Sequence, residues 1–242
     1  MAHLVRAADG DGRAALNALE AAAQLAEGRD IDLAFATAAT QTRALRYDKD
    51  GEQHYDLISA LHKSVRDSDP DATLYWLARM LAGGEDPLFI ARRLIRMSVE
   101  DIGLAAPNAL PIAIAARDAY HMLGSPEGEL ALAQCAVYLA MSPKSNRVYV
   151  GFKAALDDAR TLGSLPVPLV IRNAPTQLMT DLGYGSGYQY AHDAADQVVA
   201  QQRLPDELAG KVYYEPTQQG SEARIAERLA EWRRRVAELG GE

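Results

Sequence analysis

The segment DSDPDATLYWLARMLAGGEDPLFIARRLIRM, residues 67–97, contains start and stop signals for two successive helices. Asp69 and Asp86 each precede a proline. An N-cap aspartate accepts a hydrogen bond from an otherwise unpaired backbone N–H, which is worth ~1 kcal/mol, and a proline at the next position loses no helical bond. The Gly83-Gly84 pair between them permits the positive φ that closes a last turn. The segment therefore predicts helices over 70–82 and 87–102.

The same start and stop signals recur on both sides of this segment. Ser125-Pro126 and Ser142-Pro143 repeat the pattern of a capping side chain followed by a proline. Apolar periodic runs end at Gly103, Gly124 and Gly163, as helices do when a residue free to adopt positive φ follows them. These signals predict further helices over 53–67, 108–123, 126–141 and 143–162.

The apolar residues inside these segments recur at helical spacing. In the last predicted helix, for example, they are Val148, Phe152, Leu156 and Ala159. Strict alternation, which would indicate β-strands, is scarce. Short amphipathic helices joined by tight turns pack as hairpins, so an all-α protein of stacked helical hairpins is expected.

The composition changes between Ser164 and Gly220, where prolines, glycines and tyrosines replace the helical spacing of apolar residues. Because the aromatic side chains supply surface to bury, an ordered but irregular wrap is expected there. Helical periodicity returns near Ser221 with a seam suited to packing on the body of the protein or on another subunit. The seam consists of Ile225, Leu229, Trp232, Val236 and Leu239.

The N-terminal part is expected to form a separate small unit. Two helices are predicted over 13–26 and 31–45, and the polar sequence DKDG at 48–51 follows them. A domain boundary is placed near residue 50, so that the domains are 1–50 and 51–242.

Composition excludes several classes of protein. The 242 residues are 48% hydrophobic, enough for a buried core, and no apolar run is long enough to span a membrane. Cys135 is the single cysteine, so an internal disulfide and a cysteine-rich metal cluster are excluded, and a buried, unreactive thiol is expected. The net charge of −8 opposes non-specific adhesion to nucleic acid. We expect a cytoplasmic protein in which any DNA contact uses a local basic patch.

A short string near the N-terminus carries the first family resemblance. GDGR at 10–13, followed by Leu16, Asn17 and Leu19, resembles the sensor 2 motif in the lid of clamp-loader-type AAA+ ATPases. In that family the arginine reaches the γ-phosphate of the nucleotide, which implies this role for Arg13. From the residues alone, the string also fits a helix capped by Asp11 with a solvated arginine.

The second resemblance spans nearly the whole chain. The sequence is similar to the C-terminal half of the replication-associated recombination protein A family, also called the Werner-helicase-interacting protein family. The strings that carry it are HYDLISALHKS (54–64), EDIGLA (100–105), PEGELALAQ (126–134), SPKSN (142–146), RNAPT (172–176), GYGSGYQYAHD (183–193), LPDELAG (204–210) and YYEP (213–216).

The resemblance implies a fold and a function. It implies a AAA+ lid remnant over 1–50 and a helical, clamp-loader-collar-like tetramerisation domain over 51–242. Proteins of the family are DNA-dependent ATPases of stalled replication forks. It thus implies roles in DNA replication, repair and recombination, a homotetramer, and a nucleoid-associated location. The partners that it implies, through the parent chain, are fork or single-stranded DNA and replication proteins.

The ATPase core itself is not expected within these residues. The sequence contains no G-x-x-x-x-G-K-[ST] loop, and LPDE at 204–207 is no Walker B strand because the proline interrupts it. ATP and magnesium are expected only in a longer parent chain, with Arg13 as the nucleotide-sensing residue here. We assign no catalytic residue, metal site or cofactor to this segment, since no nucleophile, base and orienting group converge.

Several other groups of residues could be read either as binding sites or as ordinary structural features. Arg92, Arg93 and Arg96 either form a basic stripe for DNA phosphates or pair with acidic neighbours such as Glu100. The stripe would suit an alternative function, a stand-alone helical adaptor that binds DNA or a replication protein. The three glycines at 183, 185 and 187 indicate a tight turn carrying tyrosines and not a phosphate loop, and the scattered histidines do not suggest a zinc site.

Overall fold

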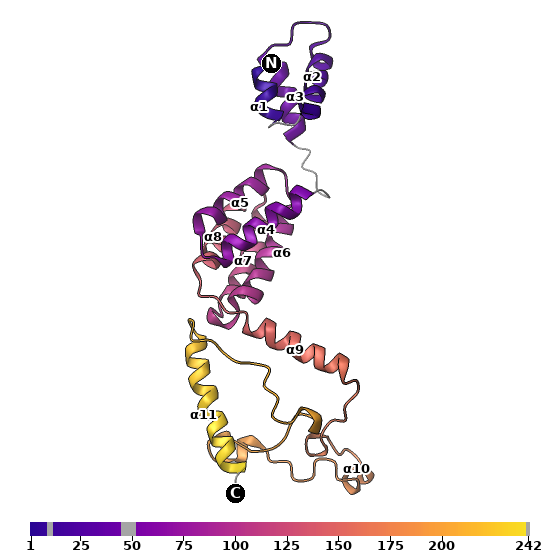
Figure 1. The fold of residues 1–242 in the computed structure, drawn as a ribbon, viewed down its shortest axis with the longest axis vertical. Coiled ribbons are helices and arrows are strands. Elements are labelled where there is room, and N and C mark those ends of the chain that lie inside the picture. Colours follow the sequence, from indigo (N-terminus) through magenta and orange to yellow (C-terminus); the bar gives the residue numbers. More distant parts are fainter. Residues whose placement is uncertain (9–11, 45–51, 241–242) are drawn as a thin grey trace. The chain divides into compact units, whose positions relative to one another are not determined.

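The computed structural model describes residues 1–8, 12–44 and 52–240, and these residues contain helices and turns but no β-strand (Figure 1). The all-α prediction is therefore confirmed. The chain divides into two compact units, one of Met1–Ile95 with Ile112–Met141, and one of Arg96–Pro111 with Ser142–Glu242. The boundary predicted near residue 50 falls among 45–51, outside the described residues.

The N-terminal helices are α1 (Ala2–Ala8), α2 (Gly12–Ala26) and α3 (Leu33–Ala44), which contact one another in a three-helix bundle (Figure 1). Leu4, Ala18 and Ala36 form its buried centre. Helices α2 and α3 match the segments predicted over 13–26 and 31–45, whereas α1 was not predicted. Helix α1 has seven residues and buries only Leu4. Such a short helix is marginal alone, so its formation depends on the contacts with α2 and α3.

The remainder of the first unit contains α4 (Glu52–Arg66), α5 (Pro70–Ala82), most of α6 (Pro87–Met97) and α7 (Ala109–Leu123), and α8 (Glu129–Met141). Helices α4, α5 and α8 pack mutually and bury their apolar faces. Burial of each large aliphatic side chain contributes ~1.5–3 kcal/mol, which is the main stabilising term. The most deeply buried side chains of these three helices include Leu61, Val65, Leu77, Met80, Leu132 and Leu139.

The predicted caps at the two aspartates are confirmed. The carboxylate of Asp69 accepts the backbone N–H of Ala72 at 2.9 Å, and that of Asp86 accepts the N–H of Leu88 at 2.9 Å. Gly84 follows α5 with φ 84°, a backbone conformation that costs glycine little. Cys135 is buried as expected, and burial raises the pKa of its thiol to about 12, so the unreactive protonated form dominates at neutral pH.

Two predicted helix starts were wrong. The helix expected from Pro126 begins at Glu129, after a turn in which the Gly128 N–H donates to the Gly124 carbonyl at 2.6 Å. The helix expected from Pro143 is α9 (Arg147–Thr161). Tertiary contacts displace that start, because the backbone N–H of Ser145 donates to the Asp101 carbonyl at 2.8 Å.

The second unit begins where α6 widens into a π-helix, η1 (Ser98–Ile102), followed by the 3-10 turn η2 (Gly103–Ala105). The predicted helix over 87–102 thus changes type before it ends. A Cβ on Gly103 would lie 2.7 Å from the Ser145 carbonyl oxygen, so glycine permits this close approach. After α7 and α8 the chain returns to this unit at Ser142, and α9 then contacts η1 and η2.

The wrap between α9 and α11 (Glu222–Gly240) is irregular, as predicted (Figure 1). It contains the single-turn helix α10 (Gln177–Asp181) and short 3-10 turns, namely η3 (Leu169–Ile171), η4 (Ala191–Asp193), η5 (Ala195–Gln197) and η6 (Asp206–Leu208). Gly183, Gly185 and Gly187 all adopt positive φ in a turn that carries tyrosines, as expected. A Cβ on Gly151 would lie 2.3 Å from the Tyr213 carbonyl oxygen, so glycine lets the wrap approach α9.

A buried carboxylate attaches the end of the wrap to α11. Glu222 has no exposed surface, and its oxygens accept the Tyr214 hydroxyl at 2.9 Å and both the backbone N–H and hydroxyl of Thr217 at 2.9 and 2.7 Å. Burial acts to raise the pKa of Glu222, but hydrogen bonds from Ser145, Thr217 and Tyr214 outweigh it and hold the pKa below its ordinary 4.5. Glu222 is therefore an ionised anchor at neutral pH.

Candidate functional site

Arg13 lies in the first turn of α2, as the sequence predicted for a helix entered through GDGR. Asp9, Gly10 and Asp11 lie outside the described residues, and so does the side chain of Arg13. The neighbouring Gly12 and Leu16 are exposed.

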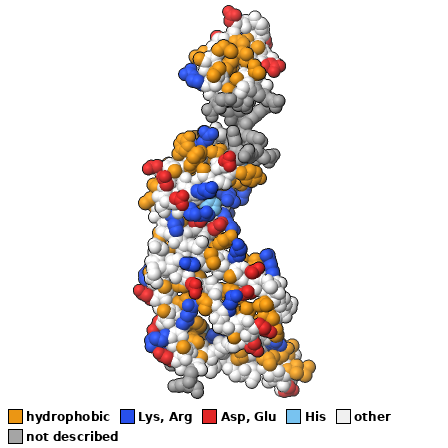
Figure 2. Space-filling model, in the orientation of Figure 1, with side chains coloured by type: hydrophobic (Ala, Val, Ile, Leu, Met, Phe, Trp, Pro, Cys, Tyr) orange, Lys and Arg blue, Asp and Glu red, His pale blue; other side chains and the backbone are white. Residues whose placement is uncertain are grey.

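The α1–α3 bundle also presents apolar side chains to its surroundings. Figure 2 shows hydrophobic side chains gathered over it. Leu16 on α2 and Leu33 on α3 are 68% and 67% exposed, and Val5 on α1 is 60% exposed. Large apolar side chains grouped at this exposure on so small a bundle are typical of a surface that packs against another domain.

The arginines of α6 differ in their surroundings. Arg96 donates through Nε to Glu100 at 2.5 Å, and its guanidinium lies 5.5 Å from the centre of the Tyr149 ring. Arg92 is exposed, with a loose 3.7 Å ion pair to Asp86 and its guanidinium over Phe89. Arg93 is half-buried, and its Nε has no hydrogen-bond partner among the described residues. Arg96 therefore forms the pair with Glu100 that was the alternative to a contact with DNA phosphates.

Helix α9 exposes an apolar face that the sequence pattern had marked for packing. Val148 and Phe152 are 43% and 67% exposed. Its opposite flank contacts the wrap through Asp158, which accepts the Tyr213 hydroxyl at 2.8 Å and pairs with Lys211 at 2.8 Å. The hydrogen bonds from Lys211 and Tyr213 lower the pKa of Asp158. The polar flank is thus occupied within the unit, while the apolar face stands open.

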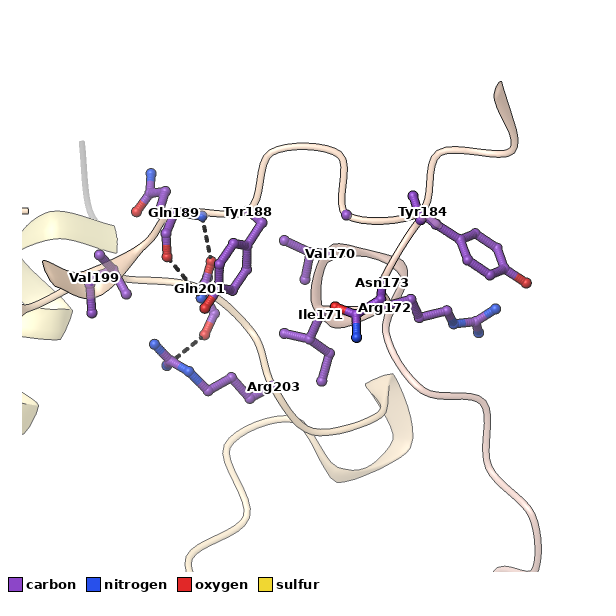
Figure 3. A pocket seen from close by; sticks show the side chains of 13 residues that line it. Val170, Ile171, Arg172, Asn173, Tyr184, Tyr188, Gln189, Val199, Gln201 and Arg203 are labelled. Carbon is purple, nitrogen blue, oxygen red and sulfur yellow. Dashed lines mark hydrogen bonds between the residues drawn. The ribbon is translucent and has the colours of Figure 1, made fainter. Parts of the chain in front are cut away.

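A hollow of about 710 Å³, which was not predicted from the sequence, lies within the wrap (Figure 3). It is lined by residues from three stretches, 170–174, 184–191 and 199–203, that are separated along the chain. The strings RNAPT and GYGSGYQYAHD, which carried the resemblance, both contribute to this lining, but only the fold brings the three stretches together.

Other candidate sites have structural roles. His54 pairs with the buried Glu85 at 2.5 Å and packs against Phe89. In the parts of the chain that are described, no group of three or more His, Cys, Asp or Glu side chains is placed to hold a metal ion. None of the described helices is both long and apolar enough to cross a membrane.

Comparison with known proteins accounts for almost the entire chain. Residues 67–233 match the family model described as MgsA AAA+ ATPase C terminal, and residues 1–66 match the AAA C-terminal domain. The chain is 50% identical over 236 residues to replication-associated recombination protein A of Coxiella burnetii and 50% identical over 228 residues to that of Escherichia coli K12. It is 43% identical over 233 residues to the ATPase WRNIP1 of Dictyostelium discoideum.

These alignments cover 96%, 92% and 88% of the chain respectively. The chain spans only about half the length of the two bacterial relatives, 54% and 51%, and 27% of the Dictyostelium protein. The similarity lies in the C-terminal part of the relatives. Since the family model covers the π-helix junction, α9 and the wrap in one continuous match, the chain belongs to the family of the MgsA AAA+ ATPase C-terminal domain.

Proposed function

We propose that this chain is the assembly and nucleotide-sensing C-terminal region of a AAA+ DNA-dependent ATPase that acts in replication-fork maintenance, recombination and DNA repair. The observation that carries the assembly role is the open apolar face of α9. Val148, Phe152 and Ala159 are exposed, and they fall on one side of the helix at about 100° per residue. A second copy of the chain is the occupant that best fits, because homo-oligomers bury self-complementary faces of this kind.

The homotetramer implied by the resemblance is part of this proposal. Light scattering at micromolar concentration should give a mass of roughly four times the 26.2 kDa of the chain. A single species of 26.2 kDa under these conditions would contradict it.

The nucleotide-sensing role rests on the position of Arg13 and on the apolar surface of the α1–α3 bundle. An ATPase core supplied by a longer protein would cover Leu16 and Leu33, and would hold ATP and magnesium, for which this chain has no phosphate loop. Arg13 would then add positive charge at the γ-phosphate. DNA and replication proteins are the proposed partners, in a nucleoid-associated cytoplasmic setting.

In a chain extended upstream by the ATPase core of a relative, Arg13→Ala should lower ATP turnover by about 10-fold or more, because a cation that stabilises transferring phosphoryl charge is lost. The mass in solution should not change, since the charge does not take part in packing. Steady-state turnover and light scattering on the same preparation measure the two effects. Equal loss of assembly would show that Arg13 is structural.

The second candidate function, an adaptor that contacts DNA through Arg92, Arg93 and Arg96, is favoured by the exposure of Arg92 and its loose ion pair. Replacing all three with alanine should weaken DNA binding and reduce its salt dependence, because each phosphate contact releases counterions. Fluorescence anisotropy at two salt concentrations measures this. Unaltered affinity would remove these arginines from the DNA interface.

A further inference from the structure

A second hollow, of about 470 Å³, lies where the wrap meets the end of α11. Its lining consists of the apolar residues Ala194, Val198, Val199, Ala200 and Leu239 and the polar residues Gln189, Tyr190 and Asp193. Gln189 and Val199, labelled in Figure 3, line the hollow of about 710 Å³ as well. The charges differ, because two arginines line that hollow, whereas Asp193 is the one charged side chain in the described lining of the second.

The two walls of the second hollow are held together. Arg235 of α11 pairs with Asp196 of η5 at 3.0 Å, and a Cβ on Gly240 would lie 3.8 Å from the Cβ of Ala200. Val198 and Val199 are only 9% and 4% exposed, so their burial holds this part of the wrap in place. The hollow is therefore formed before a ligand arrives, as small binding sites usually are.

The backbone that shapes this hollow is strained. Asp196 and Gln197 both have φ 57°, in the left-handed region that residues with a side chain rarely adopt. Such strain persists only where the surrounding structure imposes it, and it is concentrated at ligand sites. Here the strained pair turns the chain so that Asp193 before it and Val198 after it line the same hollow.

Tyr190 and Asp193 form the polar side of the hollow. They lie at the two ends of one tight turn, in which the Asp193 N–H donates to the Tyr190 carbonyl at 3.0 Å. Side chains three positions apart in such a turn lie on the same side. Tyr190 is 55% exposed, and the carboxylate of the exposed Asp193 has no hydrogen-bond or ion-pair partner among the described residues. A free carboxylate beside an accessible aromatic ring attracts a cation through both groups.

The end of α11 adds to this negative field. The last carbonyl groups of a helix have no partner within it, and together they carry roughly half a negative charge. Leu239, in the last turn of α11, lines the hollow. No lysine or arginine is present in the described lining, and Arg235, one turn earlier, is engaged by Asp196 and Glu231. The negative charge at the hollow is therefore not neutralised within it.

These groups select among ligands. A phosphate or an acidic peptide would be repelled by Asp193 and by the end of α11. A metal ion needs several oxygen ligands at once, and a single carboxylate does not supply them. A wholly apolar side chain would cover Asp193 and leave its charge unpaired. A cation on an aliphatic stem satisfies both halves of the hollow, because the stem covers Val198 and Leu239 while the charge reaches the carboxylate.

We propose that the second hollow receives an arginine side chain from a basic, apolar segment of a partner protein. The aliphatic part of that side chain packs on Val198 and Leu239, and its guanidinium pairs with Asp193 and stacks on Tyr190. Arginine fits better than lysine, because its planar guanidinium can stack on a ring and pair with a carboxylate at the same time. The site depends neither on assembly through the α9 face nor on Arg13.

Nuclear magnetic resonance of the valine methyl groups in the whole chain tests this, with the peptide acetyl-Gly-Leu-Arg-Leu-Gly-amide as the probe. The methyl signals of Val198 and Val199 should shift as the peptide is added. The same peptide with glutamine in place of its arginine should bind about 10-fold more weakly, because it has no charge to pair with Asp193. Added salt should weaken binding of the arginine peptide only.

Variants of the two polar residues locate the contact. Asp193→Asn keeps the shape of the side chain and should weaken binding by about fivefold. Tyr190→Ala should also weaken it by about fivefold, while Tyr190→Phe should stay within about twofold of wild type. Glu207→Gln is the matched control, because it removes one exposed carboxylate of the wrap that does not line the hollow. The methyl spectrum of each variant without peptide should overlay that of wild type, since the replaced side chains are exposed.

Each outcome decides the proposal. If the Val198 and Val199 signals do not shift, if the two peptides bind equally, or if Asp193→Asn binds as tightly as wild type, the hollow is not an arginine site. If polyglutamate shifts the same signals instead, the ligand is an anion and the proposal is wrong. If Asp193→Asn lowers the mass measured by light scattering, the occupant is a second copy of the chain and not another protein. Weaker peptide binding at unchanged mass supports the site whether or not the α9 face joins the copies.

Discussion

Replacing Phe152 with glutamate should convert the proposed tetramer to smaller species, and at micromolar concentration to a single species of 26.2 kDa. Phe152 lies on the apolar face of α9 and, at 67%, has the largest exposed fraction of the large apolar side chains of that helix. Burying a phenylalanine at an interface contributes about 1.5–3 kcal/mol, and a buried unpaired carboxylate costs several more. The loss at each copy of the contact is therefore at least 100-fold in affinity.

The matched control for this substitution lies on the same helix. Lys153 is exposed and points about 100° away from Phe152, and Lys153→Ala makes the net charge more negative by one, as Phe152→Glu does. Light scattering should show an unchanged mass for Lys153→Ala, and circular dichroism should show equal helix content in both variants. If Phe152→Glu keeps the wild-type mass, the α9 face is not the contact between copies.

Replacing Glu222 with alanine should lower stability by about 2–4 kcal/mol, because the hydroxyls of Tyr214 and Thr217 and the Thr217 N–H would lose their shared acceptor inside the protein. For a chain of this size that corresponds to a fall of about 5–15 °C in melting temperature. Calorimetry measures the shift, and hydrogen exchange at the Thr217 amide localises it. Glu227→Ala, at an exposed position of the same helix, should change melting little.

The same residue gives a defined pH dependence. Because the folded pKa of Glu222 is lowered below 4.5, its contribution to stability is fully present above pH 4.5 and is lost as pH falls through the folded value. Glu222→Gln should therefore be less stable than wild type at pH 7, and the difference should shrink progressively below pH 4.5. A difference that stays constant between pH 7 and pH 3 would mean that the charge does not contribute.

The helices were predictable where their signals are local. Asp69 and Asp86 cap α5 and α6 through hydrogen bonds within three residues of sequence, so no distant part of the chain is needed to form them. Apolar spacing likewise predicted the helical segments and the all-α class. The resemblance carried on short strings was confirmed by the family match over residues 67–233.

The functional surfaces were not predictable in this way. Spacing marked Val148 and Phe152 as a packing face, but it could not tell whether that face is covered within the unit, since coverage depends on which segments the chain brings against it. Neither could spacing predict the hollow, whose Arg172 and Arg203 are 31 positions apart in the sequence. Arg13 remains a prediction from a short motif.

The displaced start of α9 separates what local sequence determines from what long-range contacts determine. Ser142-Pro143 carries a good local start signal, yet the helix begins at Arg147, because Ser145 bonds to Asp101 through its backbone and to Glu222 through its side chain. A cap contributes about 1 kcal/mol, whereas contacts with a buried carboxylate contribute more. Local sequence therefore specified most of the α-helical segments. Long-range contacts specified that α1 forms, where α9 begins, which of its faces remain open and which side chains meet in the wrap.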